Sequence, residues 1–213
     1  VPPEGLKKDI CHGCIGGCIR NKYQSKSGKS GKFMCGSSIY YAVRAQRYYG
    51  EINEVPFEAT KLIDDYGLDS YNVETMIMWL VRCYYNGVLT EEETGLPFSK
   101  IGSLEFIETL VRSIALREGF GDVMARGVHK AAETVGPKAQ ECITDYVSRT
   151  GYTFTVGGPR AYLTTGLFWA MEPRLPIQHI NEIGGVTMRW ASRESGTHSN
   201  NTQDHVGDPT LES

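Results

Sequence analysis

Residues 70–86, SYNVETMIMWLVRCYYN, repeat apolar side chains at the three- and four-residue spacing of an α-helix. The side chains that share one face are Val73, Met76, Ile77, Leu80, Val81 and Tyr84. The Asn86-Gly87 pair that follows is typical of a helix end, where glycine readily adopts the left-handed conformation. The stretch therefore predicts a helix buried along one side, and it indicates a mainly α fold.

A second amphipathic segment, residues 104–118, predicts another helix in the same core. Ser103 is a suitable N-cap, and Glu105 lies in the first turn, where negative charge is favoured. Gly119 and Gly121 follow as helix-ending residues. The apolar stripe consists of Leu104, Ile107, Leu110, Val111 and Ile114.

Weaker patterns predict shorter helices around these two. Ser38 would cap a helix that runs to about Tyr49, and Pro56 suits the first turn of a helix at 56–66. Further helices are expected within 122–135 and from Pro159 to Met171. The apolar face of the helix that Ser38 caps would carry Ile39, Ala42, Val43 and Tyr49. No alternating strand pattern longer than a few residues is found.

Composition narrows the class of protein. The 213 residues are 40% hydrophobic and carry a net charge of −3, so the basic excess of a nucleic-acid-binding protein is missing. No apolar run is long enough for a transmembrane helix, and no signal peptide is found, which favours the cytoplasm. The chain opens at Val1 and reaches a cysteine cluster almost at once. We therefore expect an internal part of a longer protein.

Three regions are expected along the chain. Residues 1–36 are polar and are interpreted as a loop around a metal site, residues 37–195 as a helical region, and residues 196–213 as a polar loop after which the chain continues. The run 27–32, SGKSGK, is interpreted as a mobile basic loop. It is not a nucleotide-binding P-loop. The register that ends in Gly28-Lys29-Ser30 has Tyr23 at the first glycine position, and the pair Gly31-Lys32 is followed by Phe33.

The strongest chemical signal is Cys11-x2-Cys14-x3-Cys18. Disulfide bonds between cysteines this close in sequence would crosslink only a short stretch of chain. Three thiolates around a glycine-rich turn are instead typical of an iron–sulfur site. A [4Fe–4S] cluster needs a fourth ligand, which is usually distant in sequence. The alternative is a zinc site, but no second C-x2-C pair occurs and His12 lies awkwardly between the cysteines.

The segment from Asp64 to Asp69, DDYGLD, joins two of the predicted helices. Carboxylates on both sides of a glycine turn can accept hydrogen bonds from a polar heterocycle. The simpler interpretation is a helix stop at Gly67 followed by Asp69 as the cap of the next helix.

Taken together, these motifs resemble the aldehyde:ferredoxin oxidoreductase family. The cysteine cluster, the Asp64-x-x-Gly67-Leu68-Asp69 turn and the run GFGDVMARGVHKAAETVG at 119–136 occur in the family's order, over roughly residues 8–180. The resemblance implies a tungsten ion held by two pterin dithiolenes beside one [4Fe–4S] cluster. It also implies largely helical second and third domains, with an N-terminal pterin-binding domain before Val1.

The resemblance assigns roles to particular residues. Cys11, Cys14 and Cys18 resemble three of the cluster ligands, and the fourth, from a downstream D-x-x-G-L-C motif, is expected beyond Ser213. The pterin-contacting residues would be Asp64, Gly67, Leu68 and Asp69.

Cys35 departs from the family pattern. Aldehyde-oxidising members have a glutamate near this position, whereas a thiolate here would be a soft ligand for tungsten. In this respect the sequence resembles the tungsten-containing benzoyl-coenzyme A reductases, a branch of the same family. Cys35 as a fourth cluster ligand or an inert thiol remains an alternative. His179 lies near the family's active-site histidine and would donate a proton to substrate, unless it is structural.

The resemblance thus implies a tungsten and iron–sulfur oxidoreductase subunit that reduces an aromatic acyl-coenzyme A ring. Aldehyde oxidation is the alternative within the family. A ferredoxin-like or iron–sulfur subunit would exchange electrons with it. Two rivals from other classes are a molybdopterin enzyme of the formate dehydrogenase type, with Cys35 on the cluster, and a zinc-binding interaction module.

Overall fold

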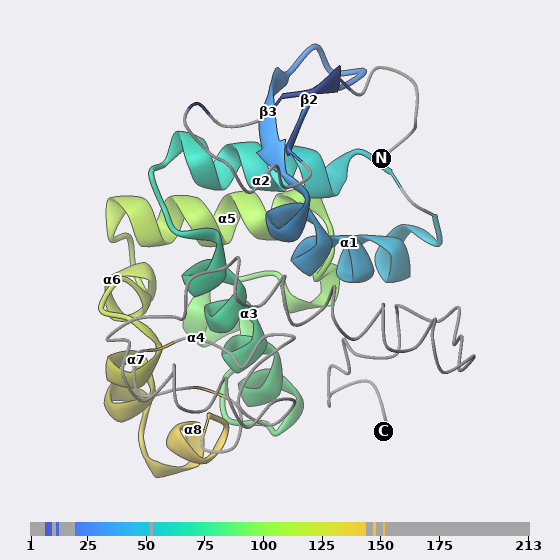
Figure 1. The fold of residues 1–213 in the computed structure, drawn as a ribbon. Coiled ribbons are helices and arrows are strands. Elements are labelled where there is room, and N and C mark those ends of the chain that lie inside the picture. Colours follow the sequence, from blue (N-terminus) through green and yellow to red (C-terminus); the bar gives the residue numbers. More distant parts are fainter. Residues whose placement is uncertain are drawn as a thin grey trace, which may run out of the picture. The chain divides into compact units, whose positions relative to one another are not determined.

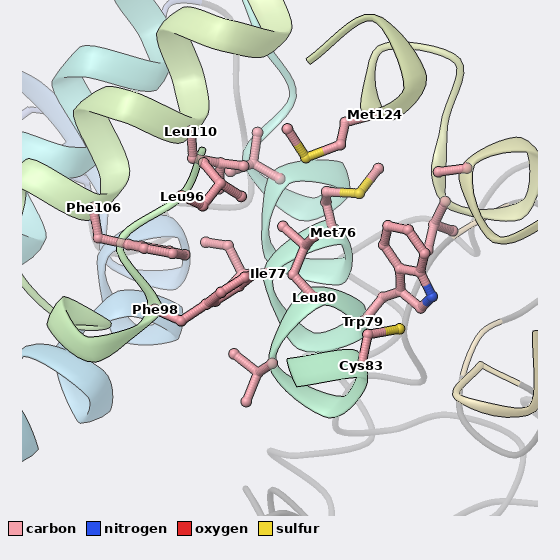
Figure 2. Close-up of a cluster of buried hydrophobic side chains, with 14 of the residues drawn as sticks. Met76, Ile77, Trp79, Leu80, Cys83, Leu96, Phe98, Phe106, Leu110 and Met124 are labelled. Atoms are coloured by element: carbon pink, nitrogen blue, oxygen red, sulfur yellow. The ribbon is translucent and has the colours of Figure 1, made fainter. Parts of the chain in front are cut away.

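Helix α3 (Ser70–Tyr85) runs through the main hydrophobic core of the computed structural model, which describes residues 7–9, 12, 20–51, 53–143, 147 and 151. Figure 2 shows Ile77, Trp79 and Leu80 pointing from α3 into the surrounding side chains. The indole nitrogen of Trp79 donates to the Ala139 carbonyl oxygen at 3.0 Å, so this buried ring also satisfies its polar atom. The predicted face of α3 is confirmed, with Tyr84 partly buried at its end.

The chain begins with a three-stranded antiparallel sheet in the order β1 (Lys7–Lys8), β2 (Arg20–Gln24) and β3 (Ser30–Met34). The loop expected over residues 1–36 is wrong for 20–24 and 30–34, which form a hairpin with Tyr23 opposite Gly31. The basic loop expected at 27–32 is wrong for residues 30–32, which belong to β3, whereas residues 27–29 lie in the hairpin turn. Ser25 N donates to Lys29 O at 2.8 Å, and Gly28 has a φ of +87°.

Helix α1 (Cys35–Tyr49) continues directly from β3 and starts three residues before the predicted Ser38 cap. Its predicted face is wrong for Val43 and Tyr49, which are exposed, whereas Tyr41 and Ala45 are buried. The buried face is fixed by polar contacts, because the Tyr41 hydroxyl donates to Ser103 O at 2.8 Å. Arg44 forms an ion pair of 2.7 Å with Glu74 of α3.

Helix α2 (Val55–Asp65) lies between the hairpin and α5 (Leu104–Leu116), as Figure 1 shows. Pro56 occupies its first turn and Ser103 caps α5, as predicted. Ile107, Leu110 and Val111 of the predicted stripe are buried.

The chain between and after these helices forms short elements. They are α4 (Glu91–Thr94), the 3-10 helix η1 (Phe98–Lys100), α6 (Gly121–Met124), α7 (Val128–Val135) and α8 (Pro137–Glu141). The pair of shorter helices expected within 122–135 is confirmed as α6 and α7, with α6 beginning one residue earlier. The mainly α class is confirmed.

The chain divides into two compact units, Val1–Val147 and Ser148–Ser213, and the elements named above belong to the first. The helix expected from Pro159 to Met171 lies outside the described residues. Within the described part, no helix has the length and apolar character needed to cross a membrane.

Candidate functional site

The turn after α2 has the geometry of a Schellman helix end. Leu68 N donates to Ile63 O at 3.0 Å, and Gly67 N donates to Asp64 O at 2.9 Å. Gly67 has a φ of +68°, which strains any residue with a side chain, and a Cβ built there would meet nothing within 4 Å. The turn therefore presents open backbone, while Leu68 anchors it by packing against the core.

Asp69 begins the next helix. Its Oδ1 accepts hydrogen bonds from Tyr71 N at 2.9 Å and Asn72 N at 3.1 Å, so it is the N-cap of α3. The helix stop and cap predicted as the simpler interpretation of this segment are confirmed. A carboxylate has several acceptor positions, so the capping role is compatible with contacts to a ligand.

Asp64 lies at the open side of the same turn. Its side chain is 46% exposed, and its Oδ2 is 2.7 Å from Lys61 Nζ, one helical turn earlier. The two acids therefore differ: the Oδ1 of Asp69 is committed to backbone N–H groups, whereas Asp64 faces solvent beside a lysine.

Polar contacts bind the hairpin to the side of α2. Glu54, at the start of α2, accepts the Tyr23 hydroxyl at 2.6 Å and the Lys26 backbone N at 2.9 and 3.0 Å. The hydrogen bond to Glu54 raises the pKa of Tyr23 to about 12, because the protonated phenol is the form that donates. Ser27 adds a 2.7 Å bond to Glu58. Glu54 was not predicted as a contact residue, although a glutamate two residues before the helix-starting Pro56 is an available signal.

Asp9 ties the chain before the cysteine cluster to the same hairpin. Its carboxylate lies 3.2 Å from Lys22 Nζ and 3.4 Å from Lys32 Nζ. The hydrogen bond from Lys22, with that from Lys32, holds the pKa of Asp9 below its usual range, against a smaller effect of desolvation. Lysines on both strands thus hold a residue two positions before Cys11.

The predicted metal ligands are only partly described. Cys11, Cys14, Cys18 and His179 lie outside the described residues. Cys35 is the first residue of α1, immediately after β3, and its backbone position is all that is described. Among the described residues, no three His, Cys, Asp or Glu side chains gather as a metal site.

Two further cysteines belong to the core. Cys83 and Cys142 are buried free thiols, and burial is the main cause that raises the pKa of Cys83, which is also hydrogen-bonded to Cys142. Figure 2 shows Cys83 on α3 beside Trp79. Neither thiol has the exposed, cation-rich surroundings of a reactive cysteine.

Residues 4–204 match the family model described as aldehyde ferredoxin oxidoreductase, domains 2 and 3. The chain belongs to this family. The match covers most of the sequence, and it agrees with the resemblance carried by the cysteine cluster and the Asp64–Asp69 turn.

Individual relatives carry oxidoreductase names, most of them tungsten-containing. The chain is 28% identical over 131 residues to the tungsten-containing aldehyde ferredoxin oxidoreductase of Pyrococcus abyssi, covering 60% of this chain and 21% of that protein. It is 31% identical over 71 residues to the WOR-like subunit of an aliphatic sulfonate oxidoreductase of Pyrococcus furiosus, covering 33% and 11%. The chain thus spans about a fifth of the first relative's length.

The fold resembles a solved structure, the active-site complex BamBC of benzoyl coenzyme A reductase in complex with 1,5-dienoyl-CoA. The TM-score is 0.53 at 21% sequence identity, over 66% of this chain and 20% of the other. The likeness supports the helical architecture described above.

The described residues fit the pterin that this family's tungsten implies. A flat, polar heterocycle needs hydrogen-bond acceptors and room for close approach. The turn offers the half-exposed carboxylate of Asp64 and the open backbone at Gly67. The left-handed glycine also serves the helix stop, whereas the Asp64 side chain has no part in that stop.

Proposed function

We propose that this chain is the cluster- and pterin-binding part of a tungsten oxidoreductase. Cys11, Cys14 and Cys18 would supply three thiolates to a [4Fe–4S] cluster. Asp64, Gly67, Leu68 and Asp69 would hold a pterin of a tungsten bis-pterin cofactor. When bound, the metal cofactor supplies the two-electron chemistry, and the protein supplies orientation, protons and exclusion of water.

The observation that carries the proposal is the Asp64–Asp69 turn. A solvent-facing acid and an open glycine lie at the end of α2, while Leu68 and the Asp69 cap hold the turn on the core. The hairpin bound along α2 leads into the cysteine cluster at one end and into Cys35 at the other. Helix α2 therefore ends in the candidate pterin turn and also holds the hairpin that follows the cysteines in the sequence.

We assign the substrate as an aromatic acyl-coenzyme A whose ring is reduced. Cys35, in place of the glutamate of the aldehyde oxidisers, supports this choice, and the benzoyl coenzyme A reductase complex has a similar fold. His179 would deliver a proton to the substrate. Electrons would come from a ferredoxin-like or iron–sulfur subunit, and the enzyme would work in the cytoplasm, where thiolates remain reduced.

Aldehyde oxidation to a carboxylic acid is the second candidate. The names of the archaeal relatives favour it, because the first of them is an aldehyde ferredoxin oxidoreductase. The residue at position 35 distinguishes the two activities, since a carboxylate there would act as an acid or base.

The test is to purify the complete enzyme, with its partner subunits, without oxygen. We expect tungsten, pterin, iron and sulfide, together with consumption of benzoyl-coenzyme A by reduced electron donor. If the enzyme turned over aldehydes and not benzoyl-coenzyme A, the proposed activity would be aldehyde oxidation instead of ring reduction. Zinc without iron or sulfide would contradict the whole proposal and favour the interaction module.

A further inference from the structure

Lys61 joins the hairpin to the candidate pterin turn. Its Nζ donates to the Lys32 carbonyl oxygen of β3 at 3.2 Å and to Asp64 Oδ2 at 2.7 Å. Lys32 is three residues before Cys35, and its side chain contacts Asp9 ahead of the cysteine cluster. A continuous set of polar contacts therefore runs from Asp9 through Lys32 and Lys61 to Asp64.

The Lys61 side chain passes so close to Gly31 that a larger residue at position 31 would crowd it. A Cβ built at Gly31 would lie 3.0 Å from Lys61 Cε and 3.3 Å from Cδ. The φ of Gly31 is not in the left-handed region, so close approach explains the glycine at this position. The lysine stem thus crosses β3 on its way to Asp64.

This lysine differs from an ordinary surface partner. Its side chain is 19% exposed, whereas Lys130, in a similar pair with Glu133 three residues on, is 67% exposed. Exposed pairs contribute little to stability and leave both side chains mobile. Lys61 is held by its packing on Gly31 and by a second acceptor, so it fixes the position of Asp64.

We propose that Lys61 is a positioning residue that orients the Asp64 carboxylate toward the pterin and aligns it with the strand that leads to Cys35. The inference rests on the proposed function, because it takes Asp64 as a pterin contact. Lys61 acts through Asp64 and through the Lys32 carbonyl.

The test compares Lys61→Met, Lys61→Arg and Lys130→Met in the complete enzyme, purified without oxygen. Methionine keeps the packing volume and removes the charge. Removing the partner that orients a cofactor-binding group typically weakens binding about 10- to 100-fold. We expect Lys61→Met to lose most of its tungsten and pterin at unchanged iron content, and to alter the spectroscopic signal of the remaining tungsten. Lys61→Arg should restore tungsten, and Lys130→Met should match the wild type.

A second variant reaches the same contact from the strand. Gly31→Ala displaces the Lys61 stem and should also lower tungsten content, with no additional loss in the Gly31→Ala/Lys61→Met double variant. If Lys61→Met does not fold, Gly31→Ala decides. If the wild type holds tungsten and pterin, and Lys61→Met and Gly31→Ala hold as much of both as Lys130→Met, this inference alone is overturned. A wild type without tungsten or pterin would instead overturn the proposed function.

Discussion

At the scale of single residues, Asp69 combines a demonstrated structural role with a proposed binding role. Its Oδ1 caps α3 through two backbone N–H groups, and the resemblance assigns the same residue to the pterin. These roles make different demands on a substitution. A cap needs one oxygen at one place, whereas a ligand contact also depends on charge and on the remaining acceptor positions.

Asp69→Ala should therefore cost about 1 kcal/mol of stability through the lost cap and remove most tungsten from the complete enzyme. Ser103→Ala is the matched control, because Ser103 caps α5 through Phe106 N at 3.2 Å and lies in no proposed site. It should show a similar fall in thermal stability with normal tungsten. Thermal unfolding and metal analysis measure both effects. Wild-type tungsten in a folded Asp69→Ala variant would leave Asp69 as a cap only.

At the scale of elements, the sequence predicted α3 and α5 well and the hairpin not at all. The faces of α3 and α5 carry enough Leu, Ile, Val and Met to dominate their pattern. The strands RNKYQ and SGKFM are mostly polar, and contacts to Glu54, Glu58 and Lys61 of α2 hold the hairpin in place. Such tertiary contacts have no local periodicity.

Other misses have specific causes. The α1 face was misassigned because Tyr41 and Arg44 turn inward to polar partners, while Val43 faces solvent. Helix α4 was missed although Thr90 and Glu93 form a capping box, a signal readable in the sequence. Within the site, the DDYGLD turn was located correctly. The contact of Lys61 with Lys32 could not be predicted, because the sequence does not show which strand lies beside α2.

The junction between β3 and α1 yields the next prediction. Cys35 is the first residue of α1, and thiolates are favoured at helix N-termini and by a bound metal. In the loaded enzyme we expect Cys35 Sγ at about 2.3–2.6 Å from tungsten, slightly longer than a zinc–thiolate bond. A metal-bound structure measures this distance. Cys35 on the iron–sulfur cluster would instead favour the formate dehydrogenase type of site.

At the scale of the whole molecule, the polar contacts around α2 connect the region of the cysteine cluster to the candidate pterin turn. Asp9 is held by the hairpin, the hairpin by α2, and α2 ends in the turn that Leu68 anchors on the core. A cluster and a pterin that exchange electrons must keep a fixed separation. We propose that the hairpin and α2 serve to hold that separation.

Iron content gives the most direct test of the cluster at this scale. Cys14→Ser should lower iron and the broad visible absorbance of the complete enzyme, because a serine replaces one of the thiolates that iron–sulfur clusters require. Cys142→Ala is the control, since Cys142 is a buried free thiol beside Cys83 and should retain full iron. Iron analysis and anaerobic spectra of both variants decide the matter. Equal iron and unchanged spectra in Cys14→Ser would show that this cysteine does not hold the cluster.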